Sequence, residues 1–230
     1  MYTLYRIVDI VHIFHESKLM SIKPLKRDTY RHGDLYRTLL SAAVRLAAVG
    51  GANAVVLREV TRQAGVSPNA AYRHFSGRQA LLQAVSWAAQ SALAIAIETE
   101  MDAINESGDA TQVARARFRA VGTGYLKFAL SQPGLFRTAF SVHNDLTQAA
   151  NLASAGKSGL TPFQLLNTAL DSLVEVGALS RERRLSAEFF AWSAVHGFAI
   201  LLIDGPLRGL DKSQVEAIRQ QLIDNIVRGL

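Results

Sequence analysis

Apolar residues recur at three- and four-residue intervals along most of this 230-residue chain, and no stretch shows sustained alternation of apolar and polar residues. The first spacing places apolar side chains on one face of a helix, whereas alternation is typical of a half-buried strand. All five prolines fall at boundaries between the apolar-periodic segments, where a helix tolerates proline best. The sequence therefore predicts an all-α fold.

Capping and breaking residues divide this periodicity into eight helices. Asp34 is the predicted N-cap of the first, which Gly50-Gly51 ends, and Ser67 caps the third, with Pro68 at its first position. Residues 141–160, rich in Asn, Ser, Ala and Gly, are predicted to form a connecting loop. The predicted helices cover 34–49, 57–64, 68 to the Ser76-Gly77 break, a segment from about 78, 109–132, 162–175, 186–203 and 213–227.

Composition excludes several classes of protein. Hydrophobic residues make up 49% of the chain and charged residues 19%, which excludes a disordered polyelectrolyte. There is no cysteine, so disulfide scaffolds, Cys-ligated zinc, iron–sulfur clusters and thiol catalysis are excluded. Gly-x-Ser-x-Gly, phosphate-loop and His-Glu-x-x-His motifs are absent from the sequence, and no carboxylate cluster accompanies His196. We therefore expect no enzymatic activity, no cofactor and no metal site.

Positive charge is concentrated at the start of the chain. Residues 1–80 contain twelve Lys or Arg and five Asp or Glu, whereas residues 81–230 contain 13 basic and 14 acidic residues. This asymmetry is typical of a polyanion-binding module followed by a neutral body, although a solvated basic face has the same composition.

The first 25 residues are interpreted as an N-terminal extension. Charged residues such as Arg6 and Asp9 interrupt its apolar residues, so it resembles neither a membrane span nor a secretory signal. Translation starting at Met20, a disordered arm, and an extra amphipathic helix packed on the body are the alternatives. The prediction is a cytoplasmic protein without a membrane partner.

The segment 57–75 has the pattern of a helix-turn-helix motif. Val60 and Ala64 give its first helix an inner face, and Gly65 allows the positive φ that a sharp turn requires. Ala71 and Phe75 form the inner face of the second helix. That helix would enter the major groove of DNA by its N-terminal residues. Its other side chains would face outward or lie along the rim: Asn69, Ala70, Tyr72, Arg73 and His74.

These residues resemble the TetR family of ligand-responsive transcriptional regulators. The resemblance rests on Ala64-Gly65-Val66-Ser67, on Tyr72-Arg73-His74-Phe75 and on Leu81. Thr61 departs from the small apolar residue usual in the family, and Arg78 from the usual lysine. The resemblance implies a three-helix DNA-binding domain at 26–80 and a helical effector-binding and dimerisation domain at 81–230.

Roles for the DNA-binding residues follow from their chemistry and the resemblance. Asn69 is suited to adenine, Arg73 to guanine and the Ala70 methyl group to thymine. The remaining candidates would hold phosphates or extend the contact surface: Lys26, Arg27, Arg31, Arg58, Ser67, Tyr72, His74 and Arg78. Two alternatives stay open, namely that Tyr72 packs against the first helix and that Arg73 is a solvated surface charge.

The second half of the chain resembles a C-terminal domain type with a Trp-His-Gly signature, here Trp192 and His196-Gly197. Its aromatic residues suit an apolar effector pocket, with an ordinary core as the alternative. His196 is interpreted as a buried, hydrogen-bonded histidine. The candidate pocket residues are Tyr125, Phe128, Phe136, Phe140, Trp192 and His196.

The last two predicted helices are candidates for self-association. Helix 186–203 is apolar nearly all round, and helix 213–227 carries an apolar stripe from Val215 to Val227. In TetR proteins these helices form a four-helix bundle across a two-fold axis. The predicted partners are therefore double-stranded DNA, a small apolar or aromatic effector and a second copy of the chain. The expected function is a repressor that an effector releases from a palindromic operator; the alternative is an effector-independent architectural DNA-binding protein.

Overall fold

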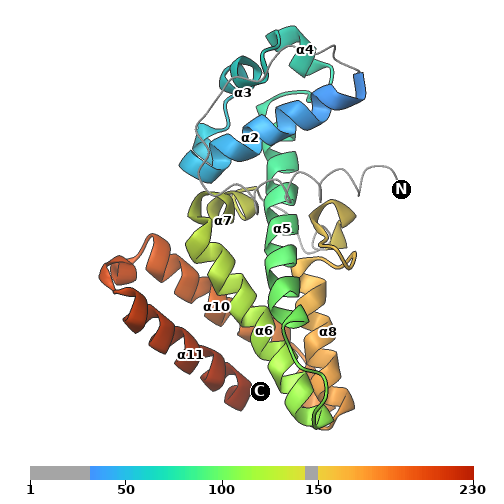
Figure 1. The fold of residues 1–230 in the computed structure, drawn as a ribbon, viewed down its shortest axis with the longest axis vertical. Coiled ribbons are helices and arrows are strands. Elements are labelled where there is room, and N and C mark those ends of the chain that lie inside the picture. Colours follow the sequence, from blue (N-terminus) through green and yellow to red (C-terminus); the bar gives the residue numbers. More distant parts are fainter. Residues whose placement is uncertain (1–31, 143–149) are drawn as a thin grey trace.

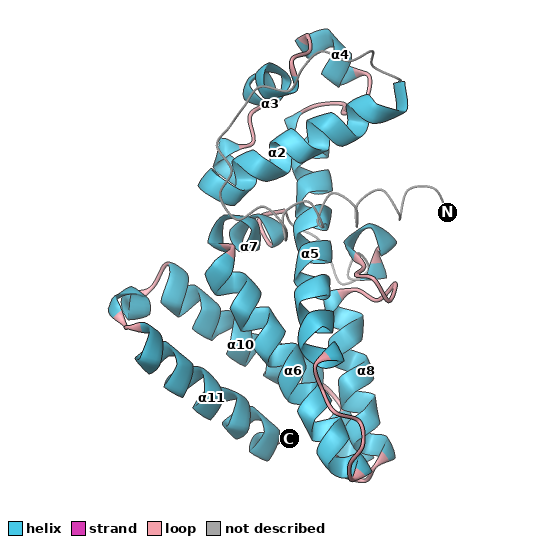
Figure 2. Ribbon diagram, viewed as in Figure 1, coloured by secondary structure: helices cyan, strands magenta, loops and turns pink. Residues whose placement is uncertain are grey.

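The computed structural model describes residues 32–142 and 150–230, and every regular element within these two ranges is helical (Figure 2). The all-α prediction is therefore confirmed. The predicted extension 1–25, the choice between Met1 and Met20, and the arm residues Lys26, Arg27 and Arg31 lie outside the described residues.

Three helices form one end of the molecule, which we call the head. They are α2 (His32–Ala54), α3 (Leu57–Ala64) and α4 (Pro68–Tyr72). The long helix α5 (Arg78–Asp102) leaves the head and runs along the rest of the molecule, which we call the body (Figure 1). The body contains α6 (Ala110–Ser131), α7 (Pro133–Ala139), α8 (Pro162–Glu175), α9 (Arg181–Arg184), α10 (Ala187–Ile203) and α11 (Lys212–Gly229), with the 3₁₀ turns η2 (Leu152–Ser154) and η3 (Pro206–Gly209).

Helix α5 is the central element of the core. It packs against α2 in the head and against α6, α7 and α8 in the body. It is long and apolar enough to span a membrane, but 67% of its apolar window is buried inside the protein. Burial by neighbouring helices accounts for this composition, because a core helix needs apolar residues on several sides.

Helix boundaries agree with the local signals in the sequence. Asp109 accepts a hydrogen bond from the backbone N–H of Gln112 and caps α6. Thr161 and Asp211 each form a reciprocal capping box at the start of α8 and α11. Pro68, Pro133, Pro162 and Pro206 stand in the first two positions of their helices, where a missing N–H costs no helical hydrogen bond.

Two predicted boundaries were wrong. Helix α2 already includes His32, so Asp34 lies within the helix and is not its N-cap. Gly51 interrupts α2 with a φ of 65°, as the predicted stop requires, but helical structure resumes through Ala54. The described part of the predicted loop 141–160 contains η2 and is fixed to α5. There the Glu98 carboxylate accepts hydrogen bonds from the backbone N–H of Lys157 (2.8 Å) and Ser158 (2.9 Å).

The short helix α7 was not predicted, and it joins the body to the head. At Gly134 a Cβ atom would overlap the carbonyl oxygens of Ala47 and Ala48, so the backbones of α7 and α2 touch there. On another side, Arg137 pairs with Asp204 at the end of α10 (2.5 Å). Helix α7 thus contacts both the head and the C-terminal part of the body.

Candidate functional site

The turn of the helix-turn-helix motif has the predicted geometry. Gly65 adopts the left-handed conformation, with φ 68° and ψ 30°, and the N–H of Val66 donates to the carbonyl of Thr61 at 3.0 Å. Only glycine adopts this conformation without a steric penalty. Thr61 is buried, and its hydroxyl donates to the carbonyl of Arg58 at 2.9 Å. The departure from the usual apolar residue is therefore accommodated by an internal hydrogen bond.

Helix α4 is held against the head by an inner face and an aromatic stack. Ala71 and Phe75 are buried, as predicted. The ring of Phe75 stacks on Tyr36 of α2 with centroids 5.0 Å apart, and His74 meets Tyr36 edge-on at 6.4 Å. Tyr36 was not among the residues predicted from the sequence. The available signal was its spacing of three and four residues from Leu39 and Leu40, which places it on the buried side of the first helix.

Most of the candidate DNA-contacting side chains of the head lie on its surface. Tyr72 is 56% exposed, and the aromatic stack on α2, the alternative considered for Tyr72, is made by Phe75. The Ser67 side chain makes no capping hydrogen bond. Five further candidates belong to the same motif. Three are exposed (Arg58, Asn69 and Arg73) and two are half-buried (Ala70 and His74).

Arg78 occupies a different environment from the other candidates. Its guanidinium donates to the carbonyl of Val55 at 2.9 Å and to that of Ala52 at 2.8 Å. These carbonyls lie where α2 ends and α3 is about to begin. Arg78 therefore fastens the first turn of α5 to the head, and any phosphate contact would be an additional role.

The head is strongly basic, as an anion-binding surface requires. Residues 32–80 contain six arginines and two acidic residues, Asp34 and Glu59. Glu59 accepts hydrogen bonds from Arg62 and Gln63, and these lower its pKa to about 2. No acidic residue lies in α4. The exposed face of α4 thus carries no negative charge that would repel phosphates.

In the body, α6, α7 and α10 bring five of the six predicted pocket residues together. Phe136 of α7 and Phe140, its C-cap, contact each other, and both contact Tyr125 of α6, with ring centroids 5.3–6.3 Å apart. Trp192 and His196 of α10 complete the group, which we call the aromatic cluster. Phe128 is also buried and belongs to the core.

A hydrogen-bonded chain runs through the aromatic cluster. The Tyr125 hydroxyl lies 2.7 Å from Nδ1 of His196 and accepts from Nε1 of Trp192 at 3.2 Å. The hydroxyl accepts from the indole and has its own O–H to donate to Nδ1 in the neutral imidazole tautomer protonated at Nε2. Burial raises the pKa of Tyr125 and lowers that of His196, so both groups stay uncharged near neutral pH. The arrangement agrees with the interpretation of His196 as a hydrogen-bonded histidine.

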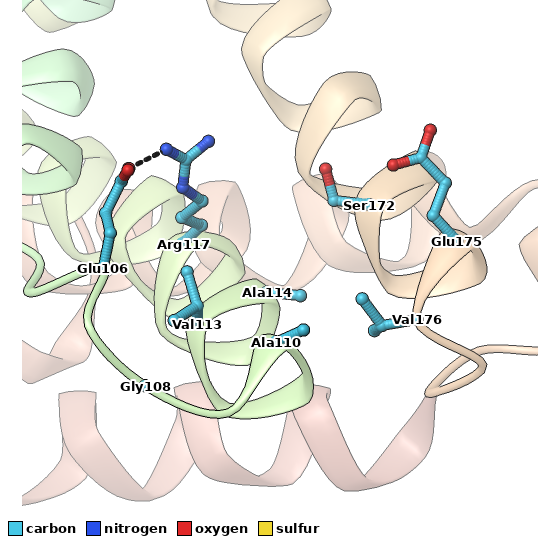
Figure 3. Close-up of a pocket in the computed structure, with 9 residues that line it drawn as sticks. All are labelled: Glu106, Gly108, Ala110, Val113, Ala114, Arg117, Ser172, Glu175 and Val176. Carbon is cyan, nitrogen blue, oxygen red and sulfur yellow. Dashed lines mark hydrogen bonds and ion pairs between the residues drawn. The ribbon is translucent and has the colours of Figure 1, made fainter.

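A separate open groove of about 320 Å³ lies at the far end of the body (Figure 3). It is bordered by the start of α6 and the end of α8, and an ion pair between Glu106 and Arg117 crosses its rim. None of the six predicted pocket residues lines it. Within the described ranges, no three His, Asp or Glu side chains gather in a way that would hold a metal ion.

Two family models match the chain. Residues 39–85 match a model described as "Bacterial regulatory proteins, tetR family", and residues 118–226 match one described as "Tetracyclin repressor-like, C-terminal domain". The first covers most of the head, and the second covers the helices that form the aromatic cluster.

Individual relatives share this organisation. The uncharacterised helix-turn-helix-type transcriptional regulator YobS of Bacillus subtilis (strain 168) is 25% identical over 174 residues, which is 75% of this chain and 81% of YobS. A Rhodococcus sp. RHA1 structure of a protein of unknown function is 26% identical, with a TM-score of 0.61 over 89% of this chain and 99% of that one. The TetR-Q116A structure from Acinetobacter baumannii AYE in complex with minocycline is 15% identical. Its TM-score is 0.53 over 87% of this chain and 96% of that one.

Proposed function

Because the chain belongs to the TetR family of transcriptional regulators, we propose that it is a repressor that a small apolar effector releases from a palindromic operator. The observation that carries the DNA-binding half is the exposed, acid-free face of α4 held on the Gly65 turn. The effector half is supported by the aromatic cluster and by the minocycline bound to the TetR-Q116A protein. A cytoplasmic location is expected for this function.

On DNA, α4 would lie in the major groove with its N-terminal residues against base edges. Asn69 and Arg73 would supply base-specific hydrogen bonds to adenine and guanine. Arg58, Tyr72 and the arm residues Lys26, Arg27 and Arg31 would hold phosphates and fix the register. One head contacts one half-site, so recognition of a palindrome requires two chains.

The surface for the second chain would be the outer face of α10 and α11. Phe189, Ile200 and Leu201 of α10 are 37–43% exposed, and Ile218 of α11 is 39% exposed. A Cβ at Gly197 would meet no atom of this chain within 4 Å, so the space beside it is open to a partner helix. Two antiparallel helices from each chain would form a four-helix bundle around a two-fold axis.

Effector binding would reach the head through α5 and α7. Arg78 ties the first turn of α5 to the carbonyls between α2 and α3, so a tilt of α5 moves the head. Helix α7 contributes Phe136 to the aromatic cluster, with Phe140 as its C-cap, and touches α2 at Gly134. An effector releases the repressor only if it binds the DNA-incompetent arrangement more tightly.

The test is a titration of the full-length protein onto duplex DNA from upstream of its own gene and onto a scrambled duplex, at two salt concentrations. Specific binding that weakens steeply with salt is the expected result, and the slope reports the number of phosphates held. Equal affinity for both duplexes would contradict the repressor and favour the architectural alternative.

The residue-level control compares two arginines. Arg73→Ala is expected to weaken specific binding by about tenfold or more, since a bidentate arginine–guanine pair is worth about 1–3 kcal/mol. Arg181→Ala, at an exposed arginine of α9 in the body, changes the net charge by the same amount as Arg73→Ala. It is expected to leave specific binding unchanged. Equal losses in the two variants would refute a specific role for Arg73.

A further inference from the structure

Two half-buried side chains on α5 each carry a buried nitrogen without a hydrogen-bond partner. Among the residues that the structure describes, the buried side-chain nitrogens that find no acceptor are Nε2 of Gln83 and Nε1 of Trp87. They are four residues apart on one helix, so they lie one above the other on the same face. Each buried N–H without an acceptor is destabilising, and native proteins retain few of them.

The chain itself offers the matched comparison. The other glutamine on this side of α5, Gln90, donates to the carbonyl of Ala139 at 2.9 Å. The other tryptophan, Trp192, donates to the Tyr125 hydroxyl at 3.2 Å. The same side-chain types are thus paired elsewhere in the body, and the unpaired ones occur together.

The surroundings place these nitrogens on the face of α5 between its contacts with Ala139 and with Ala155. Ser86 and Gln90 donate to the carbonyl of Ala139 at the end of α7, and Ser91, the residue after Gln90, donates to the carbonyl of Ala155 just after η2 (2.7 Å). Gln83 and Trp87 share the α5 face that these contacts flank. They are also within three turns of Arg78, which fastens α5 to the head.

The charge environment limits the chemistry of a ligand. No charged residue lies between Arg78 and Glu98 on α5. Arg78 is bonded to carbonyls of the head, and Glu98 to the backbone of residues 157 and 158. On the neighbouring α7, Arg137 is paired with Asp204. A neutral acceptor therefore fits better than an anion, and one carbonyl oxygen has two lone pairs for two N–H donors.

We propose that Gln83 and Trp87 form the polar contact of the effector site, and that they bind a neutral carbonyl oxygen carried on an apolar frame. This assignment rests on the proposed effector response and names the class of effector. Hydrogen bonds at this position join a ligand directly to the helix that moves the head.

The first experiment uses the full-length protein without any ligand and compares melting temperatures. Gln83→Leu is expected to melt about 4 °C or more above Gln90→Leu, because the first removes an unpaired donor and the second breaks a hydrogen bond. The Trp87→Phe protein is expected to have a higher melting temperature than the Trp192→Phe protein for the same reason. Both members of each pair gain or lose the same side-chain atoms, so the comparison matches the chemical change and tests the pairing of the nitrogen. Equal Tm values within each pair would show that the nitrogens are bonded inside the protein and would overturn the proposal.

The second experiment uses benzophenone and diphenylmethane, which differ by a carbonyl in place of a methylene. Benzophenone is expected to raise the Tm more than diphenylmethane does. Its affinity, measured by isothermal titration calorimetry on the otherwise unchanged protein, is expected to fall about tenfold on Gln83→Leu. A benzophenone shift no larger than that of diphenylmethane, including no shift with either compound, would overturn the proposal. Neither experiment involves DNA, so loss of operator binding would refute the repressor while leaving this site standing.

Discussion

At the scale of single residues, two arginines near the motif illustrate how similar side chains serve different ends. Arg73 is exposed on the outer side of the motif, whereas Arg78 donates to two carbonyls of the head. Arg78→Ala is expected to lower the free energy of unfolding by about 1–2 kcal/mol through the lost hydrogen bonds. Arg73→Ala is expected to leave it unchanged. Thermal melts of both variants check this. An Arg78→Ala protein as stable as the unchanged protein would show that the two hydrogen bonds of Arg78 contribute nothing to stability.

Tyr125 is the residue on which the aromatic cluster depends. Tyr125→Phe removes the hydroxyl that pairs with both Trp192 and His196 and leaves two partly buried polar groups without it. We expect a loss of about 1–3 kcal/mol in the free energy of unfolding, measured by urea titration. Tyr72→Phe is the matched control, because the Tyr72 side chain is exposed, and it is expected to be neutral. Equal effects would contradict a structural role for the Tyr125 hydroxyl.

His196 should make stability depend on pH. Its pKa in the folded protein is lowered by burial, so below about pH 6.5 the unfolded chain binds a proton that the folded chain does not. The contribution is therefore complete above that pH and is lost as the pH falls toward the folded-state pKa. Tm is expected to fall between pH 7 and 5, and His196→Asn, whose Oδ1 can still accept from Tyr125, should reduce the fall. If Tm falls as steeply with pH in the His196→Asn protein as in the unchanged protein, groups other than His196 cause the pH dependence.

At the scale of elements, α7 shows what close packing requires. Gly134→Ala would push a methyl group into the carbonyl oxygens of Ala47 and Ala48, so α7 or α2 must shift. We expect the free energy of unfolding to fall by about 1–3 kcal/mol, as for other overpacked sites, and operator binding to weaken. Gly122→Ala on α6 is the control, since its Cβ would meet Ile223 at an ordinary 3.5 Å. Melting curves and DNA titrations of both variants provide the measurement; an unaffected Gly134→Ala would refute the contact.

Sequence patterns predicted the elements better than the contacts between them. The helix 57–64, the Gly65 turn and the starts at Pro68, Arg78 and Pro162 all follow from local signals. Helix α7 was missed because its seven residues are too few to show a helical period, and η2 because it is fixed by distant residues of α5. The unpaired nitrogens of Gln83 and Trp87 could not be predicted from the sequence for the same reason, because a hydrogen-bond partner can come from a residue far away in the chain.

At the scale of the whole molecule, self-association is the property to test. Leu201→Asp places a charge on the exposed face of α10 and is expected to convert a dimer into monomers, with loss of specific DNA binding. Val49→Asp is the control, because Val49 is an exposed apolar residue of the head at 92%. Sedimentation velocity distinguishes the species. A Leu201→Asp protein that sediments like the Val49→Asp protein would place the dimer surface elsewhere.

The contact between α7 and α2 also sets a rule for recombining parts of such proteins. A natural cut for grafting this head onto another body would be the start of α5, where the motif ends. A graft made there would separate Gly134 from the Ala47-Ala48 backbone with which it is in close contact. The interchangeable unit is therefore discontinuous in the sequence, and a working chimera must bring residues 133–139 along with the head.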